Sequence, residues 1–293
     1  MRIELHNSNP RNYSRRSIKT TKKRSASLTY AVLILGLMVV LLPFAWMIST
    51  SLKPLSEVFS TSLRLIPRKP EWRNYIKIWS ELPFGRYYIN SFIVSIASTV
   101  VQLSLGSMAA FAFARLRWPG RDKLFVVYLA AMMIPGQVTM IPNFLIVRAL
   151  GGFDKYWGLV LPQSFGVFGV FLLRQFFKAI PSSLEEAATI DGASPWKIYA
   201  SIILPLSKNG LAALGVFAFM FSWNNFLWPL VITSKNSMFT LPIGLLSFQG
   251  QYSTDFPMMM AAACLSMLPV LALYAVAQRH FIEGVALTGL ANS

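Results

Sequence analysis

Six long apolar segments constrain this 293-residue chain more than any other feature of its sequence. A helix needs about 20 apolar residues to cross the hydrocarbon core of a bilayer. The segments are 28–51, 88–113, 124–147, 157–173, 211–233 and 256–277, and none contains Asp, Glu, Lys, Arg or His. We therefore predict an all-α, polytopic membrane domain over residues 28–293 with six transmembrane helices, of which 157–173 is the shortest.

The charge composition agrees with a membrane chain. Only 13% of the residues are charged, whereas a soluble domain usually has about 25%. The net charge of +16 does not indicate a nucleic-acid partner, because the basic residues cluster beside apolar segments. The single cysteine, Cys264, lies in an apolar run and is expected to be a small buried residue.

The distribution of basic residues predicts an orientation. Cytoplasmic loops of membrane proteins carry an excess of Lys and Arg. With six spans, 17 of the 27 Lys and Arg residues lie on the same side of the membrane as the N-terminus. The N-terminus is then cytoplasmic, as a basic, unstructured tail over 1–27 that contacts anionic lipid, with 28–51 as a retained anchor. The loop 182–207 is also cytoplasmic, while 52–87, with one short helix near 72–79, and 234–255 are external.

Prolines interrupt most of the predicted spans. Proline removes a backbone donor and kinks a helix, which lipid tolerates only where neighbouring helices or a water-lined cavity satisfy the freed carbonyls. The prolines are Pro135, Pro142, Pro162, Pro229 and Pro269. Kinked helices suit a path through the membrane, and they also occur in purely structural bundles.

The loop SSLEEAATIDGASPWKIYASIILPLS, residues 182–207, reads as two short helices around a glycine turn. Ser182 or Ser183 with Glu185 or Glu186 has capping-box spacing. Gly192 marks the stop, Ser194-Pro195 starts a second helix, and Leu204-Pro205 ends it. An interfacial helix pair is one reading, but such helices are usually basic on their polar face. The acidic run favours docking into a protein cleft.

The sequence contains no motif by which the chain could energise transport on its own. A proton-coupled carrier keeps an ionisable residue in the membrane, and a nucleotide-driven pump needs a phosphate-binding G-x-x-x-x-G-K-[ST] loop. The sequence has neither, nor an H-E-x-x-H or G-x-S-x-G motif, and His6 and His280 are expected to be solvated. We predict a chain that is not an enzyme, binds no metal or cofactor, and is driven by a partner ATPase.

One motif resembles a known family. The run Glu186-Ala187-Ala188, then Asp191-Gly192, then Leu204-Pro205, is similar to the EAA loop of ABC-importer permeases. Further stretches resemble the smaller permease subunit of the maltose-type carbohydrate branch. These are 51–59, 74–95, 171–194, 223–233, 240–256 and 281–290.

The resemblance implies a type I importer fold and a set of partners. They are a homologous second permease subunit, two ATP-binding subunits that hold ATP and Mg²⁺, and an extracytoplasmic solute-binding protein, all at a bacterial cytoplasmic (inner) membrane. Glu186 would pair with a basic residue of the ATPase, and Gly192 would form the turn between the coupling helices. Residues 240–256 would reach the binding protein, and 286–293 would approach the ATPase.

Polar and aromatic residues inside the spans are candidates for lining a sugar path. They are Gln137, Asn143, Gln163, Trp223, Asn224, Asn225 and Trp228. Amides and flat rings suit the hydroxyls and C–H faces of sugars. The same residues also serve structure, because amides hold helices together and tryptophans anchor membrane interfaces.

Three functions compete at this point. The sequence favours a sugar- or oligosaccharide-importer permease. A second reading keeps the family and changes the cargo to glycerol phosphate, a peptide or a polyamine. A third is an ATP-independent channel or carrier, which leaves the loop 182–207 without a purpose.

Overall fold

A computed structural model describes residues 14–59, 64–249 and 254–290, and that part of the chain is helical without a strand. The elements, in chain order, are α1 Ser14–Ser51, α2 Leu55–Val58, α3 Arg73–Glu81, α4 Phe84–Arg115, α5 Arg121–Ala130, η2 Ala131–Met133, α6 Gly136–Ala149, α7 Tyr156–Val160, α8 Val167–Ala179, α9 Ser183–Ile190, α10 Pro195–Ile198, η3 Tyr199–Ile203, α11 Leu204–Leu206, α12 Lys208–Trp223, α13 Leu227–Ile232, η4 Asn236–Met238, α14 Leu241–Leu246 and α15 Phe256–Leu290.

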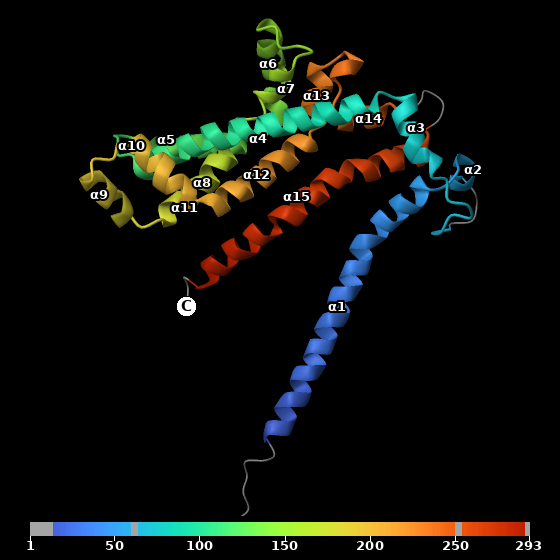
Figure 1. Ribbon diagram of the computed structural model, residues 1–293, viewed down its shortest axis with the longest axis horizontal. Helices are drawn as coiled ribbons and strands as arrows, with labels where there is room; N and C mark the ends of the chain where they lie inside the picture. Colours follow the sequence, from blue (N-terminus) through green and yellow to red (C-terminus); the bar gives the residue numbers. More distant parts are fainter. Residues whose placement is uncertain (1–13, 60–63, 250–253, 291–293) are drawn as a thin grey trace, which may run out of the picture.

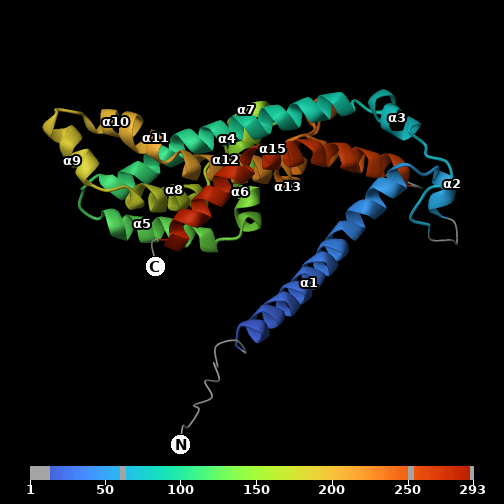
Figure 2. The ribbon, with the colours of Figure 1, turned by 60° about the horizontal axis from the view of Figure 1, so that its bottom comes forward.

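The long helix α4 organises the molecule. It packs most extensively against α8 and α12, and α15 lies beside α12 (Figure 1). The short helices α9 and α10 lie at one end of α4, and α2 and α3 lie at the other (Figures 1 and 2). The C-terminal end of α1 contacts α15. Towards its N-terminus α1 diverges from the bundle, so that the apolar stretch of α1 is exposed. The two ends of the bundle therefore carry different loops.

Small polar side chains make the close packing of α4 possible. Ser91, Ser95 and Ser98 are all at most 3% exposed, and their spacing of four and three residues places them along one side of the helix. In a membrane, helices associate through small residues that let backbones approach closely, because lipid gives apolar side chains no reason to leave it. These buried serines therefore let neighbouring segments approach this side of α4 closely.

Three hydrophobic clusters are distributed along α4. Phe84 and Tyr87 pack with residues of α3, α14 and α15 near the end that carries α3. Val94 packs with α7 and α13 in the middle. Ala110 and Phe111 pack with α8, α10, η3 and α12 near the end that carries α9. One helix thus contributes to every part of the core.

The third predicted span, 124–147, is broken. Helix α5 with η2 and helix α6 meet at 97°. Pro135 explains the break, because the residue before a proline is disfavoured in the helical conformation. Ile134 is accordingly extended, with φ −84° and ψ 115°.

The fourth and fifth predicted spans, 157–173 and 211–233, are not continuous helices either. Between α7 and α8 the chain is not helical from Leu161 to Gly166, a segment that includes Pro162. Between α12 and α13 it breaks at Asn224–Phe226, whereas Pro229 is accommodated inside α13. Three helices of the described chain are long and apolar enough to cross a membrane, Thr29–Ser51, Phe84–Arg115 and Phe256–Gln278, and counting each sharply bent helix pair as one span raises the number to six.

The segments outside the spans follow the sequence in part. The short helix expected near 72–79 is α3, and Asn74 on it donates hydrogen bonds to the carbonyls of Ser51 and Lys53. The predicted unstructured tail is wrong for 14–27, because α1 begins at Ser14; this stretch is rich in Lys and Arg, which are good helix formers. Residues 1–13 lie outside the described chain.

Asp154 joins the loop before α7 to the loop after α13. Its carboxylate accepts hydrogen bonds from the Ser234 N–H at 2.7 Å, the Ser234 hydroxyl at 2.8 Å and the Lys235 N–H at 3.0 Å. Partial burial raises the pKa of this carboxyl, but these hydrogen bonds and the charge of Lys235 outweigh it and hold the pKa below its usual range. The loop that follows α13 is therefore anchored to the loop between α6 and α7.

We expect Asp154→Asn to lower the free energy of unfolding by roughly 1 kcal/mol at neutral pH. Asparagine tolerates the positive φ of 56° at this position, so the change isolates the loss of charge. The lowered pKa means that the stabilisation is present above the ordinary aspartate pKa of about 3.9 and is lost as the pH falls through the folded pKa. Thermal unfolding in detergent should show a gap between wild type and variant that narrows below about pH 4. A gap that is independent of pH would contradict this account.

Candidate functional site

The helix breaks surround one cavity of about 1090 Å³. Its lining includes Gly136 and Gln137 from the α5–α6 break, Pro162, Gln163 and Gly166 from the α7–α8 break, and Asn224, Asn225 and Phe226 from the α12–α13 break. Irregular backbone at membrane depth is tolerated where it is buried in protein or lines a water-filled cavity. The breaks and the cavity therefore have one physical origin.

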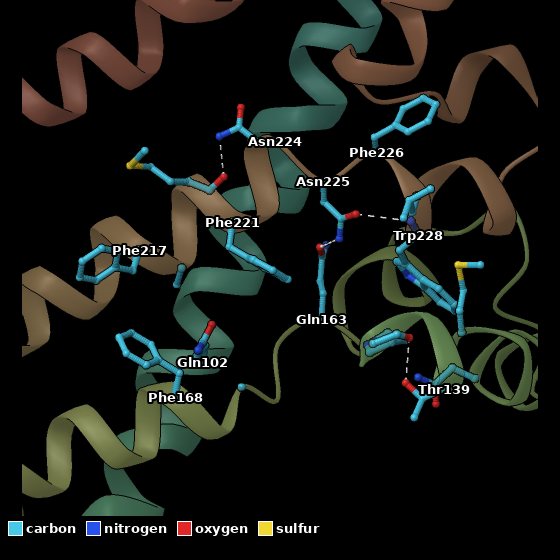
Figure 3. A pocket seen from close by; sticks show the side chains of 18 of the residues that line it. Gln102, Thr139, Gln163, Phe168, Phe217, Phe221, Asn224, Asn225, Phe226 and Trp228 are labelled. Carbon is cyan, nitrogen blue, oxygen red and sulfur yellow. Dashed lines mark hydrogen bonds between the residues drawn. The ribbon is translucent and has the colours of Figure 1, made fainter. Parts of the chain in front are cut away.

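Gln163 and Asn225 connect two of the breaks. The Asn225 side-chain amide donates to Gln163 Oε1 at 2.9 Å (Figure 3). Gln163 Nε2 in turn donates to the Leu159 carbonyl at 2.8 Å. Trp228 adds a third link, because its indole N–H donates to the Gly158 carbonyl at 3.0 Å. These three side chains line the cavity and at the same time hold α7 and the segment that follows it to the α12–α13 break and α13.

Gln102 of α4 is a cavity residue that sequence reasoning missed. Its side chain is 9% exposed and makes no hydrogen bond among the described residues. A Cβ on Gly166 or Gly169 would lie 2.6 or 2.9 Å from Gln102 Nε2, so these glycines leave room for the amide. Figure 3 shows it beside Phe168 and Phe217. The signal was present in the sequence as the one long amide in the apolar segment 88–113.

The other path candidates differ in position. Gln137, Asn143 and Asn224 line the cavity, and the Asn224 amide donates to the Met220 carbonyl at 2.9 Å. Trp223 does not line it. Its ring is 3% exposed and stacks on Phe219, and its N–H donates to the Ser266 carbonyl of α15 at 3.1 Å. Trp223 is a core residue because it ends α12 on the side that faces α15.

The loop 182–207 forms the helix pair that its sequence predicts. Gly192 has φ +76°, a left-handed conformation that favours glycine, and the Ala193 N–H bonds to the Ala188 carbonyl at 2.9 Å. The Ser194 hydroxyl then accepts from the Lys197 N–H at 3.3 Å, with Pro195 at the first helical position. The turn and the second cap agree with the sequence.

Two details of the loop differ from the prediction. Ser182 makes no side-chain cap, and Glu185 instead forms an ion pair with Arg115 at 2.9 Å, so there is no capping box. Pro205 does not end the second helix, which continues to Leu206. The π-helical turn Tyr199–Ile203 precedes this proline and widens the helix where its ring would otherwise clash with a carbonyl. The sharp bend of 78° follows at Ser207.

The outer surface of the loop combines charge with apolar groups. Glu186 and Ala187 are exposed, Ala188 is half-buried, and Ile190 and Trp196 are 86% and 62% exposed. Asp191 and Gly192 are exposed as well, whereas Leu204 packs against the core of the bundle. In the described residues no group of three or more His, Cys, Asp or Glu could hold a metal ion.

A family model confirms the class of protein. The model described as "Binding-protein-dependent transport system inner membrane component" matches residues 102–286, so this chain belongs to that family of membrane permeases. The match covers α4 from Gln102 onward, the cavity and the loop 182–207.

Curated relatives agree over most of the chain. The chain is 36% identical over 266 residues to the sn-glycerol-3-phosphate transport system permease protein UgpE of Pectobacterium atrosepticum, covering 88% of this chain and 94% of the relative. It is 31% identical over 275 residues to the diacetylchitobiose uptake system permease protein NgcG of Streptomyces coelicolor, covering 92% and 91%. Among solved structures, a bacterial ABC transporter involved in alginate import has a similar fold, with a TM-score of 0.79, 24% identity and coverage of 89% and 98%.

A double-mutant cycle tests the link between the breaks. Gln163→Ala and Asn225→Ala should show a coupling energy of about 0.6 kcal/mol and at most roughly 1.7, the range of hydrogen bonds between membrane helices. The measurement is the free energy of unfolding of each variant in detergent. Gln163→Ala combined with Asn224→Ala is the matched control, because Asn224 bonds to Met220, and its effects should add within about 0.5 kcal/mol. Additive effects in the first pair would contradict the link.

Proposed function

We propose that this chain is one permease half of an ABC importer that moves a sugar or oligosaccharide delivered by an extracytoplasmic binding protein. The single observation that carries the proposal is the union, in one chain, of an uncharged cavity bordered by broken helices and an exposed helix–glycine–helix loop at one end of the bundle. The relatives named above support the class. The chain itself is the transport subunit, and ATP with Mg²⁺ binds to partner ATPases.

The loop 182–207 is the proposed docking site for the ATPase, through which ATP-driven movement reaches the membrane helices. Glu186 offers an exposed carboxylate, and Ile190 and Trp196 offer exposed apolar side chains beside it. A polar rim around an apolar anchor is the usual anatomy of a protein interface. Glu186 would pair with a basic residue of an ATPase subunit, with Ala187, Ala188, Asp191, Gly192, Leu204 and Pro205 shaping the helix pair.

The two ends of the bundle then face opposite sides of the membrane. The loop 182–207 and the N-terminus are cytoplasmic, and the loops 52–87 and 234–255 face the binding protein. A second, homologous permease subunit completes the path on the open side of the cavity. Movement of the two halves relative to each other gives alternating access.

The cavity favours a neutral cargo. Its lining holds the amides of Gln102, Gln137 and Asn143 together with aromatic rings, and no charged side chain. The likeness to UgpE favours glycerol phosphate as the second candidate. Uptake of diacetylchitobiose, sn-glycerol 3-phosphate, a short peptide and a polyamine by the assembled importer separates these classes. Uptake of the phosphate ester alone would overturn the sugar assignment.

Glu186→Arg should reduce ATP-dependent uptake to background while the chain still inserts in the membrane. The reason is that the variant places a like charge opposite the proposed basic partner and leaves the partner's charge unpaired. Uptake in whole cells and co-purification of the ATPase are the measurements. Lys123→Glu also reverses a charge, on the exposed surface of α5 outside this loop, and should leave both unchanged. Wild-type uptake in the Glu186 variant would refute the assignment of this loop.

Gln102→Leu should weaken binding of the cargo to the membrane complex about three- to tenfold. One hydrogen bond contributes about 0.5–1.5 kcal/mol, and 1.4 kcal/mol corresponds to a factor of ten in affinity. Scintillation-proximity binding without the binding protein measures this step directly. Trp223→Phe is the control, because Trp223 packs in the core away from the cavity, and it should lower thermal stability without changing affinity. Equal affinities for wild type and the Gln102 variant would remove this residue from the path.

A further inference from the structure

Three helix ends meet beneath the loop 182–207. Helix α4 ends at Arg115, α8 ends at Ala179 and α9 begins at Ser183. The last carbonyls of a helix have no partner within it and must find donors elsewhere. The donors here are arginines, and each comes from the neighbouring helix.

The two helices exchange these arginines. Arg115 of α4 donates to the carbonyls of Phe177 and Ile180 at the end of α8, the second at 2.6 Å. Arg174 of α8 donates through Nε to the Phe113 carbonyl in the last turn of α4 at 3.1 Å. Each helix end is therefore satisfied by the other helix. We call this arrangement the arginine clasp.

Each arginine of the clasp also has a carboxylate. Arg115 Nε lies 2.9 Å from Glu185 Oε1 in the first turn of α9, with side chains 11% and 18% exposed. Arg174 Nη2 lies 3.2 Å from Asp122 Oδ1, but the Asp122 side chain is 67% exposed. Exposed ion pairs contribute little, whereas loss of one partner of a largely buried pair leaves an uncompensated charge. The Arg115–Glu185 pair is therefore the stronger connection.

Glu185 and Glu186 differ in direction although they are adjacent. Glu186 is exposed on the outer surface of α9, and Glu185 points inward to α4. One side of α9 is thus available to a partner, while the other is paired with Arg115 of α4, which also donates to carbonyls at the end of α8. A displacement of α9 would therefore act on both helices through this largely buried pair.

The helices of the clasp extend to the cavity. Gln102 lies on α4, about 20 Å along the helix from Arg115, and Phe168 lies in the first turn of α8. Between them, Ala110 and Phe111 of α4 pack in one cluster with Val170 and Leu173 of α8. The clasp and this cluster hold the two helices together over the whole distance.

We propose that the Arg115–Glu185 pair is the positioning contact that transmits displacement of the coupling helix α9 to α4 and α8, and through them to the cavity. The inference rests on the proposed function, because it needs an ATPase that moves α9. It assigns to Glu185 a role distinct from docking: Glu186 binds the partner and Glu185 passes the movement inward.

The test uses a cavity cysteine in the assembled importer. Gln137→Cys in a Cys264→Ala background gives one thiol in the exposed part of the cavity, and its labelling rate by a membrane-impermeant maleimide reports access. Addition of a non-hydrolysable ATP analogue should change that rate by at least about fivefold, the lower end of typical coupling between sites. If the nucleotide analogue does not change the labelling rate in this importer, with Arg115 and Glu185 intact, the proposed function itself is overturned.

Glu185→Gln should reduce the nucleotide-dependent change to less than about twofold while the ATPase still co-purifies at wild-type yield. Glu185→Asp keeps the charge and should retain part of the response. The control Lys123→Gln removes a charge from the exposed surface of α5 and should respond as the importer with intact Glu185 does. A full response in the Glu185→Gln importer would overturn the inference and leave the proposed function intact.

Arg115→Lys provides an independent variant. Lysine keeps the charge but lacks the planar fork that reaches two carbonyls and a carboxylate together, so the response should again fall below about twofold. Arg117→Lys, two residues along and exposed, should leave it unchanged. If the Glu185→Gln importer fails to assemble, the comparison of Arg115→Lys with Arg117→Lys tests the inference instead. A purely structural role predicts loss of assembly in proportion to loss of response, and that outcome would overturn the inference.

Discussion

The rest of the structure depends on the need of every backbone polar group in a bilayer to find a partner inside the protein. Helix α4 meets this requirement along its 32 residues without interruption. Three of the segments around it are interrupted, and their breaks at Pro135, at Leu161–Gly166 and at Asn224–Phe226 all border one cavity. The amides near those breaks bond to backbone groups and leave polar surface in the cavity. Structural and cavity-lining positions are therefore combined in the same residues, as Gln163 and Asn225 show.

Charged side chains satisfy backbone groups in two further places. At the α9 end of the bundle, Arg115 and Arg174 donate to the carbonyls that helix ends expose. In the loop before α7, the Asp154 carboxylate accepts from backbone N–H groups of the loop after α13. These charged groups lie outside the apolar segments, and they fix the loops to the helix ends. The buried residues of the described chain are otherwise mostly apolar, with serines, threonines and a few amides such as Asn90 among them.

The sequence predicted some features well because their causes are local. Gly192, Ser194 and Pro195 determine the turn and the second cap within a few residues, and the structure has both. Apolar length located the long helices. Length alone did not locate the breaks of 157–173 and 211–233, because a broken and a continuous helix have the same composition. Trp223 and Gln102 show the limit most clearly: both are polar-tipped residues in apolar segments, and only packing decides that one faces α15 and the other faces the cavity.

Participation of α4 in all three hydrophobic clusters has a mechanical consequence. Bending this helix would disturb packing along its whole length at once, and close-packed interiors do not deform gradually. The subunit is therefore expected to travel as a single stiff block whose internal contacts stay fixed while its borders slide. The contacts that change during this movement lie on the outer surface of the subunit. Substitutions there should therefore alter the rate of the transport cycle, whereas substitutions in the core should alter whether the subunit folds.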